Sequence, residues 1–372
     1  MIETISNSSA LAARLRERIA REGPITFYAW MKAALYDPID GYYCKAGRTR
    51  WGREGDYRTS PERSGLFAAS FAHYFARLYA QLGSPDEWTI LEAGGGDGHF
   101  AERLLQALEK SFPRVFSATC YVVEEVSFHS RTLAGERLRA FADRVQLKKL
   151  DDVEINCGVV FSNELLDAFP VHRIISHADR LREFYVSVDE NGNFTWIVDA
   201  PGPGLSLRLN QYFQEFGIQL GEGQVAEVNF EIEEWLGKVA AKLRKGYVVT
   251  VDYGAGAEDL YSPVADKRGT LRGFQRHQFV DDLLAQPGET DLTTTVNWSF
   301  VKSAGERLGL RMVEFERQDK FLLAAGFMEQ LAIESERCEA EAERLRITTA
   351  AREMILPDGM AAHFQVLVQQ KM

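Results

Sequence analysis

Apolar positions along the chain alternate between short runs with β-branched residues and longer stretches with helical spacing. The short runs lie at 88–91, 119–123, 145–150, 158–162 and 247–251. Residues 99–108, 127–141 and 229–244 place apolar side chains three or four positions apart, as on one face of a helix. Strands separated by helices are typical of a parallel sheet with helices on both faces. The pattern therefore predicts an α/β protein with a Rossmann-like, mostly parallel sheet.

The remaining segments predict additions to this sheet. Helical periodicity is found at residues 11–19, 25–35 and 62–80. Residues 37–61 form an aperiodic loop between the second and the third of these segments. Residues 171–199 contain three β-like runs, of which the last two are joined across 189–193 as in a β-hairpin. Residues 255–297 are polar and aperiodic. Residues 329–354 predict one helix, and 311–317 with 364–369 predict an antiparallel closing pair.

The first run leads into Glu92 and then into glycines at alternating positions, Gly94, Gly96 and Gly98. Glycine tolerates positive φ and exposes bare backbone, and the N–H groups at the start of the next helix favour an electron-rich ligand. The dinucleotide fingerprint G-x-G-x-x-G lacks its third glycine when counted from Gly94, but counted from Gly96 it reaches Ala101, a permitted variant. The spacing E-x-G-x-G-x-G resembles instead the first motif of Rossmann-like S-adenosylmethionine (SAM) methyltransferases.

Polar residues follow the second and fourth runs, where ligands of open parallel sheets bind. Glu124 or Glu125 can accept hydrogen bonds from both ribose hydroxyls of a nucleoside cofactor. If residues 163–170 are helical, Glu164 and Asp167 share a face and can clamp a guanidinium, which meets carboxylates in bidentate fashion. The alternative is an ordinary helix N-terminus, with Asn163 as cap and acids in the first turn.

Composition limits the classes of function. The formal net charge of -11 over 372 residues argues against a general nucleic-acid binder. The four cysteines are scattered, which favours buried thiols in a reducing compartment, and the histidines and cysteines never fall at metal-ligand spacing, so we expect no metal. No apolar run approaches the length of a membrane span, and the N-terminal residues predict neither a signal nor a transit peptide. We therefore expect a cytoplasmic protein without membrane insertion.

Several segments, in this order, resemble a single family. They are GPITFYAWMKAALYDPIDGYY (23–43), GDYRTSPERS (55–64), LEAGGGDG (91–98), SNELLDAFPV (162–171), VDYG (251–254), TLRGFQRH (270–277) and DLTTTVNWSF (291–300). The series is similar to the MidA-like family of SAM-dependent methyltransferases, which is related to the mitochondrial complex I assembly factor that methylates an arginine on a complex I subunit. The resemblance runs from about residue 23 to residue 367, most of the chain.

The resemblance implies roles for individual residues. The implied cofactor contacts are Glu92, Gly94, Gly96 and Gly98, with Glu125 on the ribose and Asp56, Thr59 and Ser60 from the N-terminal region. Asn163, Glu164 and Asp167 would face the substrate. Apart from the resemblance, the position of His277 after the fifth run suggests that it could line the same side, and the alternative is a structural histidine. The chain departs from the family at Asn297, where an aspartate is usual.

These inferences together predict a SAM-dependent methyltransferase that acts on a protein arginine, with a complex I (NADH dehydrogenase) subunit as the expected partner. The rival interpretations are a non-enzymatic SAM-binding assembly factor and an NAD(P)-dependent oxidoreductase. We expect residues 1–86 to form a helical and loop cap over the cofactor site, and residues 87–170 and 229–372 to form the methyltransferase core. Residues 171–228 would be a β-rich insertion on the substrate or partner side.

Overall fold

The structure is a computed structural model that describes residues 9–47, 65–275, 278–338, 340–356 and 363–372. The chain divides into two compact units, which we describe one at a time. The first unit comprises residues 1–49, 166–232 and 255–300, and the second comprises 50–165, 233–254 and 301–372. Among the described residues, no helix combines the length and the apolar character needed to cross a membrane.

The second unit contains the parallel sheet that the sequence predicts. Its strands lie in the order β15-β16-β10-β5-β2-β3-β4. Their bounds are β2 Trp88–Ala93, β3 Thr119–Glu124, β4 Val145–Leu147, β5 Gly158–Asn163, β10 Gly246–Ala255, β15 Arg311–Arg317 and β16 Phe364–Lys371. Neighbouring strands from β10 to β4 are parallel, and β16 is antiparallel to both β10 and β15. The predicted α/β class and the antiparallel closing pair are confirmed.

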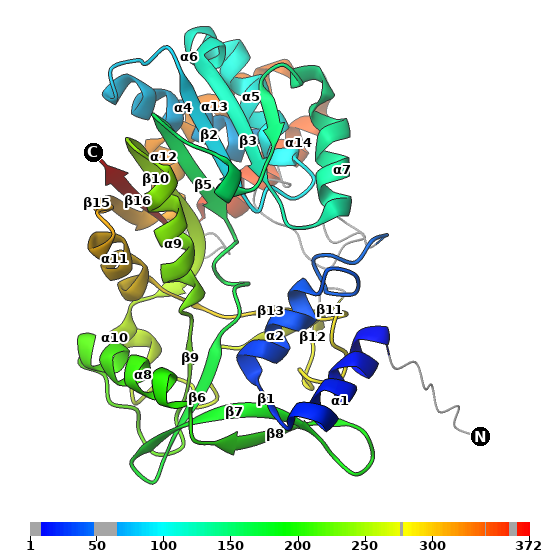
Figure 1. The fold of residues 1–372 in the computed structure, drawn as a ribbon. Coiled ribbons are helices and arrows are strands. Elements are labelled where there is room, and N and C mark those ends of the chain that lie inside the picture. The colour runs from blue at the N-terminus through cyan, green and yellow to red at the C-terminus, as the bar shows by residue number, and fades with distance from the viewer. Residues whose placement is uncertain (1–8, 48–64, 276–277, 339, 357–362) are drawn as a thin grey trace. The chain divides into compact units, whose positions relative to one another are not determined.

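The direction of the chain through this sheet reverses between β2 and β5. From β2 the chain continues to β3 and β4 on one side, whereas β5 continues to β10 on the other. Right-handed crossovers in opposite directions place the connecting helices on opposite faces. The connecting helices are α5 His99–Ser111, α6 Pro113–Ala118, α7 Phe128–Arg137 and α9 Glu231–Lys242. Together with α4 Gly65–Gln81, which precedes β2, they flank the sheet in Figure 1. The reversal is the topological switch point at which α/β proteins bind ligands.

Aromatic side chains fill the core between the sheet and α4 and α5. Phe71 of α4 and Phe100 of α5 pack against Phe161 of β5, with ring centroids 5.0 and 4.6 Å away. All three side chains are buried, and Phe71 belongs to the apolar and aromatic face of the helix predicted at residues 62–80. This packing fixes the start of α5, and with it the glycine turn, against the end of the sheet.

The C-terminal helical region differs from the expectation. The single helix predicted at 329–354 is two helices, α13 Phe327–Arg337 and α14 Glu341–Ile355, preceded by α12 Gln318–Ala324. Cys338 ends α13 with extended backbone, and its side chain is buried. The sequence predicts one helix here because the segments on both sides of Cys338 are similarly rich in glutamate and arginine, so that their periodicity does not reveal the break.

The first unit contains an antiparallel sheet in the order β1-β7-β6-β9, with β8 paired to β7. The bounds are β1 Ile25–Thr26, β6 His172–His177, β7 Arg180–Val188, β8 Phe194–Asp199 and β9 Val225–Val228. The predicted hairpin across 189–193 is confirmed: the Asp189 carboxylate accepts from the N–H groups of Asn191 and Asn193 over 2.9 and 2.8 Å. Neither β9 nor the helix α8 Pro203–Glu215 is predicted from the sequence, because glycines precede β9, prolines and glycines surround the start of α8, and neither has a strong apolar period.

Residues 255–297 differ from the expectation of an aperiodic stretch, because they contain short helices and strands. These are α10 Ala257–Leu260, β11 Arg272–Gln275, β12 Gln278–Phe279, β13 Asp291–Thr293 and β14 Val296–Asn297, followed by α11 Trp298–Arg307. Strands of two to four residues are too short for an alternation of apolar and polar positions to be recognised.

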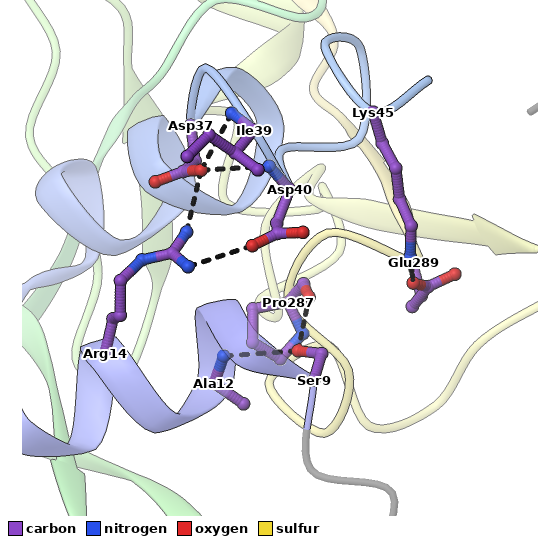
Figure 2. Close-up of polar contacts among 9 residues, drawn as sticks. All are labelled: Ser9, Ala12, Arg14, Asp37, Ile39, Asp40, Lys45, Pro287 and Glu289. Carbon is purple, nitrogen blue, oxygen red and sulfur yellow. Dashed lines mark hydrogen bonds and ion pairs between the residues drawn. The ribbon is translucent and has the colours of Figure 1, made fainter. Parts of the chain in front are cut away.

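Polar contacts fix the start of the loop predicted at 37–61 (Figure 2). Arg14 of α1 Ala10–Glu22 donates to Asp37 over 2.8 Å and to Asp40 over 2.9 Å. Lys45 forms an ion pair with Glu289. Gly288 lies so close to this loop that a Cβ atom there would be 2.2 Å from the Asp40 carbonyl oxygen. The loop therefore leaves α2 Phe27–Tyr36 in a defined conformation up to residue 47.

Candidate active site

The glycine turn lies at the carboxyl end of β2, at the switch point. Gly94, Gly96 and Gly98 have φ angles of 72°, 55° and 79°, in the left-handed region that favours glycine. The N–H groups of Gly94 and Gly95 both donate to the Glu124 carbonyl oxygen, over 2.9 and 3.0 Å. These bonds join the turn to the end of β3.

Side chains could not occupy two of these positions without displacing their neighbours. A Cβ atom on Gly94 would lie 3.0 Å from Leu165 Cδ1, and one on Gly98 would lie 3.2 Å from the Ala134 Cα atom. The turn is therefore bare backbone between closely packed elements, as the spacing predicts for a turn that holds a ligand.

The start of α5 is set by Gly98 and Asp97. Gly98 is the N-cap of this helix, and the carboxylate of Asp97 accepts from the N–H of His99 over 3.2 Å. Arg137 holds the same carboxylate over 2.6 Å and also donates to the Asp97 carbonyl oxygen over 3.0 Å. Arg137 is not predicted from the sequence, since it lies forty positions from Asp97 and belongs to no motif.

Glu92, the last acid before the glycines, is buried in the sheet with an exposed fraction of 6 %. Its Oε2 atom accepts a hydrogen bond from the Tyr121 hydroxyl over 2.7 Å. Burial is the main cause that raises the pKa of Glu92 to about 8; the hydrogen bond from Tyr121 opposes this shift, and the nearby Asp97 and Glu125 carboxylates add to it. Burial also raises the pKa of Tyr121 well above its ordinary value.

Two acids end or follow β3, and they differ in what their carboxylates contact. Glu125 accepts from the N–H of Gly96 over 2.9 Å and from the N–H of Ser127 over 2.7 Å. Glu124 accepts instead from the N–H of Leu150 over 2.8 Å, on the side of β4. Burial raises the pKa of Glu124. The arrangement favours Glu125 over Glu124 as the acid that serves the cofactor.

The segment after β5, residues 164–170, is not helical. Both interpretations of residues 163–170 given above assumed a helix there. Asn163 is the last residue of β5, and Glu164 follows with a φ of 51°. The N–H of Glu164 donates to the Val251 carbonyl oxygen over 2.9 Å, and its carboxylate accepts from the Asn163 amide over 3.0 Å. The prediction that Glu164 and Asp167 share a helical face is therefore wrong. The alternative of a helix N-terminus capped by Asn163 is wrong as well. The left-handed residue turns the chain away from the helical path.

Asp167 belongs to the first unit, where it is buried. Its carbonyl oxygen accepts from the N–H of Thr294 over 2.9 Å and from the Thr294 hydroxyl over 3.4 Å. The backbone of the NELLDAFPV segment is thus tied to the DLTTTVNWSF segment, two of the stretches on which the family resemblance rests.

Four predicted site residues, Asp56, Thr59, Ser60 and His277, lie outside the described residues. Their roles stay predictions. Among the residues that the structure does describe, no three or more histidine, cysteine, aspartate or glutamate side chains gather as metal ligands would.

The fold and the glycine turn define a Rossmann-like protein with a nucleoside-cofactor site at its switch point. The chain belongs to the Methyltransf_28 family of S-adenosyl-L-methionine-dependent methyltransferases, whose model matches residues 70–316. It is therefore a SAM-dependent methyltransferase with the class I fold, which confirms the predicted family, fold and cofactor and excludes the interpretation as an NAD(P)-dependent oxidoreductase.

Individual relatives agree with this assignment. A COG1565 superfamily member from Burkholderia thailandensis, crystallised bound to S-adenosyl-homocysteine, is 30% identical with a TM-score of 0.86, over 98% of this chain and 92% of that chain. The mitochondrial protein arginine methyltransferase NDUFAF7 homolog of Drosophila melanogaster is 27% identical over 82% of this chain and 72% of its own length. NDUFAF7 of Xenopus tropicalis is 26% identical over 80% and 71%. Because these curated relatives are named as mitochondrial proteins, the expectation of a cytoplasmic location is wrong.

The residues at the switch point fit the amino acid and ribose parts of this cofactor. The turn presents glycine backbone, and a carboxylate at Glu125 lies against it. The Oδ1 atom of Asn163, at the end of the neighbouring strand β5, is buried and accepts no hydrogen bond from the described residues. An acceptor left in this state is costly unless a ligand donor completes it. An ammonium group is a donor of the required kind.

Proposed function

We propose that this protein transfers a methyl group from SAM to an arginine nitrogen of a protein substrate. The proposal is carried by the glycine turn with Glu125 at the switch point of a chain in this methyltransferase family. The arginine acceptor is supported by the names of the curated relatives, which are protein arginine methyltransferases. A complex I subunit is the substrate that we propose to test first, on the strength of the family resemblance.

In this proposal, the cofactor is held by the residues of the turn and the ends of β3 and β5. Gly94, Gly96 and Gly98 present backbone to it, and Glu125 accepts the ribose hydroxyls. A carboxylate can accept about four hydrogen bonds, so Glu125 can hold the turn and the ribose together. The Asn163 Oδ1 atom accepts from the ammonium group. We also assign Glu92 to the cofactor site.

The substrate side of the proposal concerns Glu164 and Asp167. SAM supplies a methyl group on a cationic sulfur, and the nitrogen that receives it loses a proton. A guanidinium has a pKa above about 12, so a carboxylate is needed to orient it and to stabilise the charge that develops. Glu164 has a left-handed backbone conformation, and its carboxylate accepts from the Asn163 amide, which orients the carboxylate. We keep the roles that the resemblance implies for Asp56, Thr59, Ser60 and Asp167. We also keep His277 on the substrate side, where its position after the fifth apolar run suggests it.

The predicted division of the chain is part of the same proposal. We assign residues 171–228, which contain β6 to β9 and α8, to the substrate or partner side. Residues 1–86 are proposed as the cap, and residues 87–170 with 229–372 as the catalytic core.

Transfer of isotopically labelled methyl groups tests the proposal. The purified protein is incubated with methyl-labelled SAM and isolated NADH dehydrogenase subunits or cell extract, and labelled proteins are identified by mass spectrometry. We expect label on an arginine side chain, lost in Glu164→Gln and kept in the exposed control Glu190→Gln. Label on another residue type would contradict the arginine acceptor. Binding of SAM without any transferred label would favour the non-enzymatic assembly factor.

A further inference from the structure

Glu92 is a buried carboxyl group without a counter-charge. Its one described hydrogen-bond partner is the Tyr121 hydroxyl, a neutral donor, over 2.7 Å. Within the described part of the chain no lysine, arginine or histidine pairs with it. The titratable groups that act on it are Tyr121 on β3, Asp97 in the turn and Glu125 after β3, and both of the latter are acids. On the other side, its register partner on β5 is the apolar Phe161.

The position of Glu92 connects it to the cofactor turn. A Cβ atom built on Gly95 would lie 3.3 Å from the Glu92 carboxyl carbon and 3.4 Å from its Oε2 atom. The acid therefore lies directly beneath the backbone that we propose holds the amino acid end of SAM. That end carries an ammonium group, and the methylated sulfur beside it is cationic.

An isolated carboxylate in such a place is unfavourable, because burial in a low-dielectric region penalises the charged form. A cation that arrives next to it reverses this balance, since an opposite charge within a few ångströms favours ionisation. The group then has different protonation states in the free and the loaded protein.

We propose that Glu92 is the internal counter-ion of the cofactor: its carboxyl group is protonated in the free protein and releases its proton when the cationic end of the cofactor binds. The O–H bond of the carboxyl group breaks, and the proton passes to solvent. Tyr121 is a positioning residue that keeps donating to the carboxylate that remains. The inference rests on the proposed cofactor site and deepens it, because it couples cofactor binding to pH.

Isothermal titration calorimetry tests this coupling directly. SAM is titrated into the whole protein at pH 7 in two buffers with different ionisation enthalpies, and the difference in heat gives the number of protons released. We expect close to one proton from the unsubstituted protein. We expect none from Glu92→Gln. The matched control is Glu124→Gln, which removes a half-buried acid at the end of the neighbouring strand β3, and it should release as many protons as the unsubstituted protein.

Two further measurements keep the proposal falsifiable if Glu92→Gln binds SAM poorly. Below pH 8, the affinity of the unsubstituted protein for SAM should increase roughly tenfold for each unit by which the pH is raised, as expected when one proton leaves on binding. Infrared difference spectra should show the loss of one protonated carboxyl band when SAM is added. Tyr121→Phe should keep the proton release but move the pH at which affinity levels off upward, a shift that loss of packing alone would not produce.

S-adenosylhomocysteine identifies the cation responsible. Equal proton release with SAM and with S-adenosylhomocysteine assigns the counter-charge to the ammonium group, and greater release with SAM assigns it to the sulfonium; either supports the proposal. Binding of SAM with equal heat in both buffers, or proton release that persists in Glu92→Gln, overturns it. A protein that does not bind SAM at all would overturn the cofactor site itself, an outcome that the same titration distinguishes from SAM binding without proton release.

Discussion

The side-chain amide of Asn297 donates a hydrogen bond to the hydroxyl of Tyr212 over 2.6 Å. The Tyr212 hydroxyl is in turn 2.8 Å from that of Tyr261, which donates to the Glu227 carbonyl oxygen over 3.1 Å. The Asn297 oxygen accepts from the N–H of Phe300 over 3.3 Å, at the start of α11. An amide at this position both caps the helix and donates into the tyrosine pair, whereas the aspartate usual in the family can only accept. The departure at Asn297 therefore has a structural role within the first unit.

We expect Asn297→Ala to destabilise the protein by about 2 kcal/mol, because it removes a helix cap and leaves a buried hydroxyl without its donor. Chemical denaturation followed by circular dichroism measures the change. Asn191→Ala, in the exposed hairpin turn, is the control and should change stability by less than about 0.5 kcal/mol. Equal stability of the two variants would show that the Asn297 contacts contribute nothing.

Gly94→Ala should weaken SAM binding at least tenfold. The substitution strains a residue at φ 72° and brings a methyl group to 3.0 Å from Leu165 Cδ1, so that the turn must move. Gly192→Ala provides a control for the backbone strain alone, since Gly192 has a φ of 84° with nothing within 4 Å of its Cβ position. Both variants should lose about 1 kcal/mol of stability from the left-handed conformation. Only Gly94→Ala should change the dissociation constant measured by calorimetry, and unchanged SAM affinity would exclude the turn from the site.

Glu125→Gln and Glu124→Gln separate the two acids at the end of β3. We expect Glu125→Gln to reduce SAM affinity roughly tenfold, because hydrogen bonds to a charged acceptor contribute about 1.5–3 kcal/mol. Glu124→Gln should bind SAM within about a factor of two of the unsubstituted protein, since its side chain can still accept from Leu150 and the weakened contact is remote from the turn. The opposite order of affinities would assign the ribose to Glu124.

The elements that could be predicted from the sequence are those that are determined by residues close together in the chain. Alternating glycines at 94, 96 and 98 require positive φ, and the hairpin at 189–193 is closed by an aspartate on its own turn, so both are recognised from a few residues. The parallel strands β2, β3, β5 and β10 are recognised because each is a continuous apolar run that becomes largely buried.

The elements that the sequence did not predict depend on contacts between distant residues. Nothing near Glu164 indicates a left-handed residue, which is held by a bond to Val251 from another strand. Arg137, at the end of α7, contacts Asp97, just before α5, and Tyr121 contacts Glu92 from the neighbouring strand. The choice between Glu124 and Glu125 likewise depends on which carboxylate meets the N–H of Gly96, and adjacent positions in the sequence do not distinguish them.

The buried acid Glu92 should make the free protein less stable as the pH rises. Its carboxyl group holds a proton up to about pH 8 in the folded state but loses it near 4.5 when unfolded. Between these values the unfolded state binds fewer protons, so raising the pH favours unfolding, by at most about 1.4 kcal/mol per pH unit.

Glutamine has the shape of the protonated acid and does not titrate. We therefore expect Glu92→Gln to gain about 3 kcal/mol relative to the unsubstituted protein between pH 5 and pH 8 without cofactor. Urea unfolding at pH 5, 6, 7 and 8 measures the difference, and Glu190→Gln serves as the exposed control, whose curve should run parallel to that of the unsubstituted protein. A parallel curve for Glu92→Gln would mean that the buried carboxyl group is already ionised in the free protein.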